Sequence, residues 1–326
     1  MRPSTPRILL SLALSAACLA GAPVSAQDKP ARFMVSFTTG GTADTLARFI
    51  AQKLGEVKGV QAVVENRGGA GGTVGLETFK TWPADGSSYA VIANTQVISQ
   101  LIYPRLSYDM ARDFEPVLFL GASPMVIAAQ PSRISATSLD QVIAQAKAAP
   151  GKLVYGECAP GSAHHLAMEL LKLRSGADIR HIPYKGCSQS VTDALAGQID
   201  LVIASAPAVL PHVRSGKLVG IAVTGATRSP AAPTIAAVAE SSAAGLKGFA
   251  VDNWYGIIAA SGTPRAALAK MEADVREIMA RPEVLDRLAK AGIDVTLAGP
   301  AELRAAVVQD LKVFLPIVQA AQLKPN

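Results

Sequence analysis

The chain has 326 residues, of which 50% are hydrophobic and 17% are charged, and its formal net charge at pH 7 is +6. This length suits one large or two medium domains, and we expect two. The basic excess is small and forms no Lys/Arg block interleaved with aromatic residues, so we do not expect a nucleic-acid partner.

The first residues have the pattern of a secretory signal peptide. Arg2 and Arg7 precede an apolar run from Ile8 to Ala22, and a small-x-small site ends at Ala26. The run is shorter than the roughly 18 to 20 apolar residues that span a bilayer. We therefore predict an exported protein cleaved after Ala26, which removes Cys18.

Two cysteines, Cys158 and Cys187, remain in the exported chain. Their even number, in a compartment that permits disulfides, favours a bridge between them. Two buried thiols are the alternative, because sequence alone does not give the Cα separation that a bridge requires.

Strand-like and helical patterns alternate from the start of the exported chain. We expect strands at 33–37, 62–65 and 89–93, and helices at 44–54 and 73–81. This alternation predicts a parallel α/β sheet with helices on its faces.

The alternation begins again after Pro124. We expect strands at 125–129, 152–156, 179–182, 200–204, 218–223 and 254–259. The expected helices are 138–148, 163–174, 188–196, 265–280, 282–291 and 301–321. Ser138 is predicted as an N-cap, Pro282 lies in a first helical turn, and Gly292 marks a helix end.

A glycine turn at residues 37–44, F-T-T-G-G-T-A-D, joins the first strand to the first helix. Unpaired N–H groups and the helix dipole make such a junction an anion site, and Gly40 and Gly41 allow close approach of a ligand. Phosphate and carboxylate both remain open. Asp44 has an alternative role as a partner of the helix dipole.

A second turn, E-C-A-P-G-S at residues 157–162, precedes the helix at 163–174. Ser162 is expected to cap that helix beside a second anionic or polar group. His164 and His165 are adjacent and therefore point to different faces of the helix. A hydrogen bond within the helical turn is the default role for His165.

The sequence lacks the motifs of three other functions: nucleotide binding, zinc binding and catalysis. Glycines near residue 69 miss the last spacing of a dinucleotide fingerprint, and no Walker lysine follows. His165 and Glu169 share a helix face without a zinc motif, so we predict neither metal nor cofactor. The pairs Ser162–His165 and Cys187–His181 lack an orienting acid, so we predict no enzyme activity. An exported hydrolase and a metal or metal-chelate scavenger remain the alternative functions.

Several motifs together resemble the periplasmic solute-binding proteins of tripartite tricarboxylate transporters, the Bug receptors. They occur in one order along nearly the whole exported chain: F-T-T-G-G-T-A-D, V-E-N-R-G-G-A-G-G-T-V-G, Y-D-M-A-R-D-F-E-P-V, P-G-K-L-V-Y-G, G-S-A-H-H-L, H-I-P-Y-K-G, D-A-L-A-G-Q-I-D, S-G-K-L, R-S-P-A-A-P-T and W-Y-G-I-I-A-A-S-G-T-P.

The resemblance implies an α/β fold of the type II periplasmic binding proteins, with a ligand cleft between two α/β domains and two crossover segments. Residues 27–124 and 250–326 would form domain 1, and residues 125–249 domain 2. A monomeric receptor would close on a small carboxylate in the periplasm and deliver it to an inner-membrane permease or to a sensor protein.

The resemblance also implies that one loop from each domain grips the ligand. The residues expected at the ligand are Thr38, Thr39, Gly40, Gly41, Thr42, Ala43, Asp44, Asn94, Cys158, Gly161, Ser162, His165, Tyr184, Lys185, Gly186 and Ser205.

The chain departs from the family pattern at three places. Cys158 and Cys187 stand where the family commonly has small residues, and a disulfide there would tie two loops of the pocket together. Ala204 and Ser205 stand where members often have an aspartate that could pair with a ligand ammonium, which argues against an amino-acid ligand. The family's proline-aspartate-glycine-tyrosine turn is stretched here to P-A-D-G-S-S-Y, which alters the local register near Asp85.

Overall fold

The computed structural model describes residues 29–103, 105–320 and 322–323. The predicted signal peptide, with Arg2, Arg7, Cys18 and the cleavage site after Ala26, lies outside these residues. Within the described ranges, none of the helices has the length and apolar composition of a membrane span.

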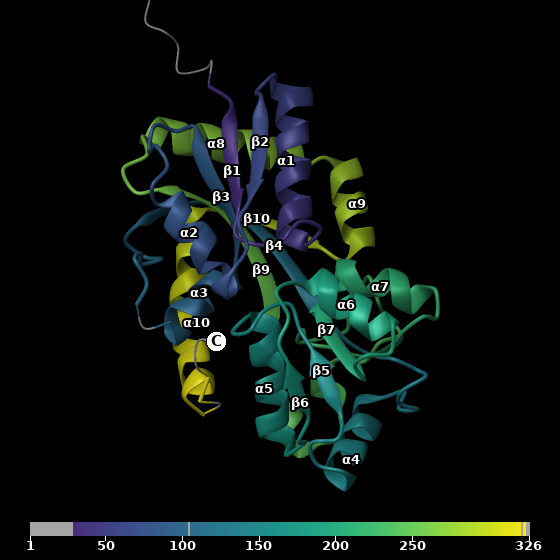
Figure 1. Ribbon diagram of the computed structural model, residues 1–326. Coiled ribbons are helices and arrows are strands. Elements are labelled where there is room, and N and C mark those ends of the chain that lie inside the picture. Colours follow the sequence, from purple (N-terminus) through teal and green to yellow (C-terminus); the bar gives the residue numbers. More distant parts are fainter. Residues whose placement is uncertain (1–28, 104, 321, 324–326) are drawn as a thin grey trace, which may run out of the picture.

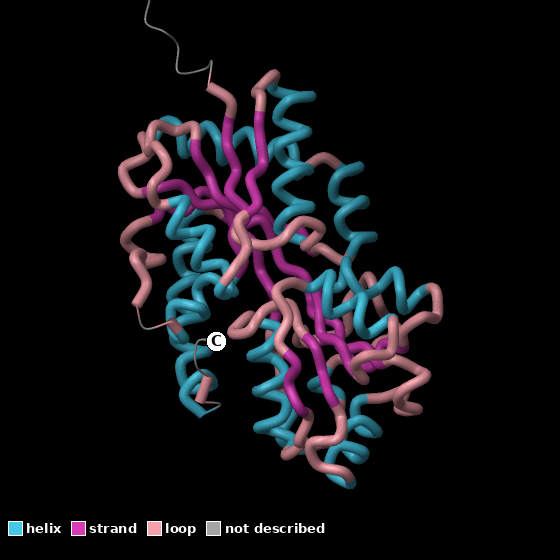
Figure 2. The backbone as a smooth tube through the Cα atoms, viewed as in Figure 1, coloured by secondary structure: helices cyan, strands magenta, loops and turns pink. Residues whose placement is uncertain are grey.

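Strands and helices alternate along the described chain (Figures 1 and 2). The strands are β1 (Ala31–Val35), β2 (Ala62–Asn66), β3 (Ser88–Ala93), β4 (Phe114–Ala129), β5 (Val154–Gly156), β6 (Arg180–Ile182), β7 (Leu201–Ser205), β8 (Val219–Val223), β9 (Asp252–Ala260) and β10 (Asp294–Ala298). The α-helices are α1 (Thr42–Lys58), α2 (Thr73–Phe79), α3 (Asn94–Ile102), α4 (Leu139–Ala148), α5 (Ala163–Ser175), α6 (Cys187–Leu195), α7 (Ala206–Arg214), α8 (Arg265–Met279), α9 (Pro282–Ala291) and α10 (Pro300–Ala320). Short 3₁₀ helices occupy Ala70–Gly72, Val238–Glu240 and Ala244–Leu246.

The strands pair in the order β2-β1-β3-β9-β4-β7-β5-β6, and β10 and β8 also pair with β4. Strand β4 is shared: residues 114–124 pair with β9, and residues 125–129 pair with β7. We call β1, β2, β3, β9, β10 and residues 114–124 the first half, and β5 to β8 with residues 125–129 the second half. Figure 1 shows the first half above and the second below, joined by β4.

The sheet is mixed, whereas the alternation of patterns predicted a parallel one. Parallel pairing is confirmed for β1 with β2 and β3, and for β5 with β6 and β7. The antiparallel pairs involve β4 and β9. The strand predicted at 125–129 is only the end of β4. Pro116 lies beside a register shift, and a bulge accommodates a residue that has no N–H to donate.

Helix α1 shows how local sequence positions the edge of the first half. Leu46, Ile50 and Leu54 recur every four residues, are buried, and pack in one cluster with Phe33 of β1. Gly59 ends the helix in the left-handed conformation, with φ 67°. This packing fixes the N-terminus of α1 at the carboxyl end of β1.

Three predicted helix ends are confirmed. The Ser138 hydroxyl accepts a hydrogen bond from the N–H of Gln141 at the start of α4. Pro282 is the first residue of α9, and Gly292 follows that helix in the left-handed conformation. Helices α3 and α7 and strand β10 were not predicted. In α7, Pro207 and Pro211 break the helical pattern, although Pro207 lies in the first turn, where its missing N–H costs no helical bond.

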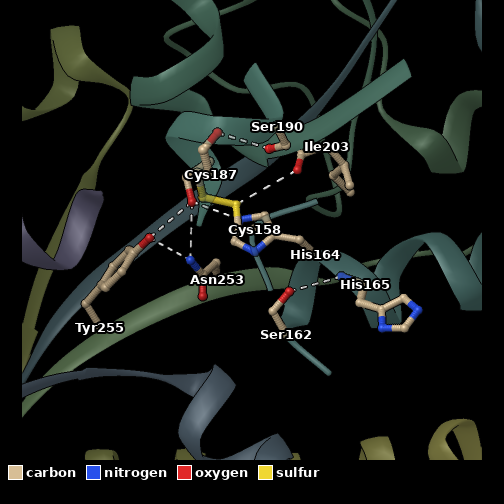
Figure 3. The surroundings of a disulfide bond; sticks show 10 residues. Cys158, Ser162, His164, His165, Cys187, Ser190, Ile203, Asn253 and Tyr255 are labelled. Atoms are coloured by element: carbon tan, nitrogen blue, oxygen red, sulfur yellow. Dashed lines mark hydrogen bonds between the residues drawn. A yellow bond between two sulfur atoms is a disulfide. The ribbon is translucent and has the colours of Figure 1, made fainter. Parts of the chain in front are cut away.

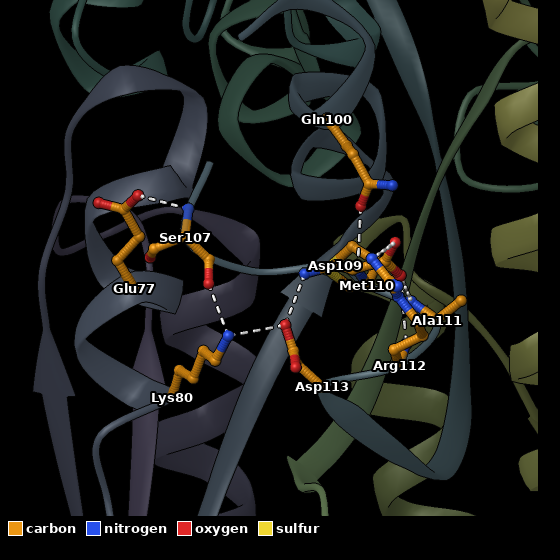
Figure 4. A network of polar contacts seen from close by, with 9 residues as sticks. All are labelled: Glu77, Lys80, Gln100, Ser107, Asp109, Met110, Ala111, Arg112 and Asp113. Carbon is orange, nitrogen blue, oxygen red and sulfur yellow. Dashed lines mark hydrogen bonds and ion pairs between the residues drawn. The ribbon is translucent and has the colours of Figure 1, made fainter. Parts of the chain in front are cut away.

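The motif at 108–117 organises the approach to β4 (Figure 4). Asp109 Oδ1 accepts a hydrogen bond from the N–H of Ala111, and Asp113 Oδ2 accepts one from the N–H of Asp109. Lys80 Nζ lies 2.9 Å from Asp113 Oδ2. The motif therefore fastens the start of β4 to the end of α2 and has a structural role.

Candidate functional site

A small cavity of about 50 Å³ lies between the two halves. Its lining comes from both halves: Phe37, Thr38, Gly41, Thr42, Ala43, Ala93, Thr95, Cys158, Ala159, Ser162, His164, Gly186, Cys187, Ser188, Ser205, Asn253 and Tyr255. It lies at the carboxyl ends of parallel strands, where α/β sheets bind their ligands.

Five helices begin at this cavity. Helices α1, α3, α5, α6 and α7 follow strands β1, β3, β5, β6 and β7, and each contributes N-cap or first-turn residues to the lining. Gly41, Gly186 and Ser205, the N-cap residues of α1, α6 and α7, make no side-chain cap hydrogen bond. The two glycines have no side chain, and the Ser205 hydroxyl makes no cap, so nothing at these positions competes with a ligand for the N–H groups of the first turns.

The first-half turn is held by Asp44, a buried residue of α1. Its carboxylate accepts hydrogen bonds from the N–H of Gly40, from Arg48 and from Asn66. Burial raises the pKa of Asp44, but these three donors outweigh burial and hold the pKa below its usual value. Gly40 has φ 86°, which a glycine adopts without strain. Asp44 thus fixes the shape of the turn.

The second-half turn reaches the cavity through Cys158, Ala159 and Ser162. The Ser162 hydroxyl accepts the N–H of His165, as the predicted cap requires. Cys158 and Cys187 form a disulfide, so the structure contains the bridge that the sequence favoured. The bond joins the turn after β5 to the first residue of α6.

Four polar side chains form a network at the inner wall (Figure 3). Ser205 Oγ lies 3.0 Å from His164 Nε2 and 3.2 Å from the Tyr255 hydroxyl. Asn253 Nδ2 donates to the Tyr255 hydroxyl at 2.6 Å and to Ser205 Oγ at 3.3 Å. Asn253 Oδ1 and His164 Nδ1 are buried and have no hydrogen-bond partner among the described residues. The network thus keeps spare hydrogen-bonding capacity.

The cavity carries no formal charge of its own. None of its described lining residues is Lys, Arg, Asp or Glu. Burial lowers the pKa of His164 to about 3, so the ring is neutral at pH 7. Each helix N-terminus carries about +0.5 of an elementary charge, so the helix termini supply the positive potential.

The expected ligand residues divide between the cavity lining and positions behind it. Thr38, Gly41, Thr42, Ala43, Cys158, Ser162, Gly186 and Ser205 line the cavity. The rest do not line it: Thr39, Gly40, Asp44, Asn94, Gly161, His165, Tyr184 and Lys185.

Sequence reasoning did not select the other lining residues: Phe37, Ala93, Thr95, Ala159, His164, Ser188, Asn253 and Tyr255. Ala93 is the last residue of a predicted strand and Thr95 follows it, and that position was a usable signal. Asn253 and Tyr255 lie at the start of antiparallel strand β9, which carries no local mark of a site.

His165 faces a second cavity, which it lines with Gly161 and His181. His165 Nδ1 accepts the N–H of Gly161 at 3.0 Å, within the same turn, and its ring stacks on that of His181 with centroids 4.1 Å apart. His181 Nε2 lies 2.9 Å from Oε1 of the buried Glu157. The histidine pair thus supports the second-half turn from behind.

The two catalytic pairs considered from the sequence are not assembled. The Ser162 hydroxyl contacts the backbone N–H of His165, whose ring Nδ1 is taken by Gly161. Cys187 is in the disulfide, and His181 pairs with Glu157. Neither of the two predicted pairs is therefore formed.

Comparison with known proteins gives consistent relatives. A family model described as "Tripartite tricarboxylate transporter family receptor" matches residues 46–323. Protein BugT of Bordetella pertussis is 33% identical over 308 residues, which cover 93% of each chain.

Solved structures of similar proteins share the fold. The R. palustris protein Rpa4515, described with adipate, superimposes with a TM-score of 0.87 at 29% identity, over 92% of this chain and 99% of the other. MatC from Rhodopseudomonas palustris, with bound malate, gives a TM-score of 0.81 at 25% identity, over 91% and 100%. The fold is that of the periplasmic binding proteins of this type.

Proposed function

Because the chain belongs to the tripartite tricarboxylate transporter receptor family, we propose that this periplasmic solute-binding receptor takes a small organic carboxylate into the cavity between its halves. One observation carries the proposal: five helix N-termini meet at a cavity whose described lining has no ionised side chain. Such a site attracts an anion without a neutralising partner.

The proposed contacts come mainly from two turns. First-turn N–H groups of α1 receive one carboxylate, with the hydroxyls of Thr38 and Thr42 beside it. The α5 and α6 N-termini, through Ser162 and Gly186, close over the rest of the ligand, and Ser205 faces its inner end. Hydrogen bonds to a charged group contribute about 1.5 to 3 kcal/mol each, so several of them support micromolar binding, about −8 kcal/mol.

The other expected residues then shape the two turns. Asp44, through its bond to Gly40, and His165, through its bond to Gly161, hold the backbone that meets the ligand. The adipate and malate described with the similar structures support a dicarboxylate as the ligand class.

Domain closure is the proposed mode of capture. Residues 27–124 with 250–326 form one domain and residues 125–249 the other, and the closed monomer delivers its ligand to the permease or to a sensor protein. The signal peptide directs export and is cleaved after Ala26. The receptor changes no covalent bond of its ligand.

A thermal-shift screen followed by calorimetric titration tests the ligand class. We expect dicarboxylates such as adipate or malate to raise the melting temperature and to bind with 1:1 stoichiometry. Their diamide counterparts, matched in length but uncharged, should give no shift. A non-acidic ligand that stabilises the protein while every carboxylate fails would contradict the proposal.

A pair of matched variants tests the location. Ser188→Asp places a carboxylate on the second residue of α6, at the cavity, and like-charge repulsion should weaken binding at least tenfold. Ala266→Asp makes the same type of change at the second residue of α8, an exposed position outside the cavity lining. It should leave the dissociation constant within twofold, and equal effects of the two variants would place the ligand elsewhere.

A further inference from the structure

The Cys158–Cys187 disulfide forms part of the cavity wall. Cys158 belongs to the turn after β5, and Cys187 is the first residue of α6, so the bond joins two segments 29 residues apart. Cleavage of the bond would leave both sulfur atoms at the cavity. Figure 3 shows both cysteines beside the ring of His164.

His164 supplies a third donor atom at the same place. A ring nitrogen of His164 and the two Sγ atoms all lie within 4.8 Å of one another. His164 is 3% exposed, and its Nδ1 has no hydrogen-bond partner among the described residues. A buried imidazole with an unused ring nitrogen is available to a ligand.

We propose that reduction of the Cys158–Cys187 disulfide turns this corner of the cavity into a site for a single Zn²⁺ ion, held by the two thiolates and the His164 imidazole. Two Cys and one His with one position left open is a donor set that zinc accepts in proteins, in tetrahedral geometry. With Zn–S distances of about 2.3 Å, the sulfurs would stand roughly 3.8 Å apart. Cys187 begins a helix and Cys158 lies in a turn, so side-chain rotation can separate them.

The reduction is a thiol–disulfide exchange with a dithiol. A thiolate of the dithiol attacks one sulfur, the other cysteine leaves as a thiolate, and the second thiol of the dithiol resolves the mixed disulfide. The dithiol is oxidised by two electrons to its own disulfide, and the two cysteines are reduced. Zinc then replaces the two thiol protons, which pass to the solvent.

The neighbourhood of the sulfurs suits this ion. Cys187 lies in the first turn of α6, where the helix dipole stabilises a thiolate, and Ser205 beside His164 offers an oxygen near the open position. His165 and Glu169, the pair weighed from the sequence, lie at the second cavity, where Glu169 Oε1 already accepts hydrogen bonds from Tyr155 and Lys172. The proposal does not depend on what anion the oxidised cavity takes.

Cobalt substitution tests the site on the full exported chain. The protein is reduced with dithiothreitol, freed of it by gel filtration without oxygen, and titrated with Co²⁺. We expect a thiolate-to-Co²⁺ charge-transfer band that saturates at one equivalent and disappears when Zn²⁺ displaces the cobalt. The unreduced protein should show no such band.

Variants connect the band to these residues. Cys158→Ser/Cys187→Ser should lose it, and His164→Ala should weaken Co²⁺ binding at least tenfold. His212→Ala removes a histidine of α7 that is not on the cavity wall and should stay within twofold of the parent chain. Circular dichroism checks that each variant is folded. Absence of the band in the folded, reduced parent chain overturns the proposal, as does unchanged affinity in folded His164→Ala.

Discussion

Gly186 gives a test of closure that acts through one contact between the halves. It is the N-cap of α6, and a Cβ added to it would lie 2.5 Å from Thr38 Oγ1, in the other half. Its φ of −179° is extended backbone that alanine adopts freely. Gly186→Ala therefore perturbs the approach of Thr38 without straining the chain.

The size of the expected loss of affinity follows from the distance between the added Cβ and Thr38 Oγ1. Ordinary contact begins at 3.4 Å, so the facing groups must move apart by about 0.9 Å. Overpacking of this kind costs about 1 to 3 kcal/mol, and only the closed form bears it. Since 1.4 kcal/mol is a factor of ten, dicarboxylate binding should weaken roughly 5- to 150-fold. The melting temperature without ligand should stay nearly unchanged.

Calorimetric titration of the best-binding dicarboxylate measures the effect. Gly55→Ala, in the interior of α1, is the control, because its Cβ would lie 3.9 Å from the nearest atom outside its helical turn, the Val60 carbonyl oxygen. Thr38→Ala removes the opposing hydroxyl, so Thr38→Ala/Gly186→Ala should bind about as well as Thr38→Ala alone. If Gly186→Ala binds like the parent chain, or if the losses of the two single variants simply add, then the closed contact does not govern affinity.

Three further predictions concern stability. Asp44→Asn should lower the free energy of unfolding by about 1.5 to 3 kcal/mol at pH 7 in urea titrations, because the charged acceptor of three hydrogen bonds is lost. Since the folded pKa of Asp44 is lowered, its contribution is present above the unfolded pKa and disappears as pH falls through the folded value, so the difference between the two proteins should shrink as the pH is lowered. Burial raises the pKa of Asp310 to about 6. Between about pH 4 and 6 the carboxyl group is therefore protonated in the folded protein and ionised in the unfolded one, so the free energy of unfolding falls as pH rises through this window. Asp310→Asn, which keeps an acceptor for Trp254 Nε1, should raise stability at pH 7.5 by on the order of 1 to 3 kcal/mol and change it little at pH 4; a loss at pH 7.5 would contradict the burial argument. Cys158→Ser/Cys187→Ser should cost about 3 to 4 kcal/mol by denaturant unfolding, the loop-closure entropy expected for a separation of 29 residues. Thiol titration of the unreduced exported chain should find no free cysteine, and two reactive thiols would show that the bridge is absent.

Much of the fold could be predicted because local signals agree with it. The strand-to-helix units at β1–α1 and β5–α5 carry short apolar strands, glycine turns and regular apolar helix faces. The paths of β4 and β9 could not be predicted in this way. Pro116 and Pro124 interrupt the strand pattern of β4, and only pairing with distant β9 shows that the strand continues through them.

The residues of the candidate site also fall into those that the sequence could predict and those that it could not. Ligands of α/β sheets bind at the turns that follow parallel strands. This rule predicted Gly41 and Ser162, which line the cavity. Side chains that reach the cavity from an antiparallel strand, such as Asn253 and Tyr255, have no such local mark. Which of His164 and His165 faces the cavity depends on the rotation of α5, and that is set by packing against the rest of the second half.

The sharing of β4 also bears on how the molecule unfolds. One unbroken strand supplies hydrogen bonds to β9 in the first half and to β7 and β8 in the second. If β4 loses its hydrogen bonds to β9, or those to β7 and β8, the freed part of β4 no longer holds the part that pairs in the other half. The two halves should therefore denature as one cooperative unit. Calorimetry should then record a single transition, and a fragment limited to residues 125–249 should not retain native structure.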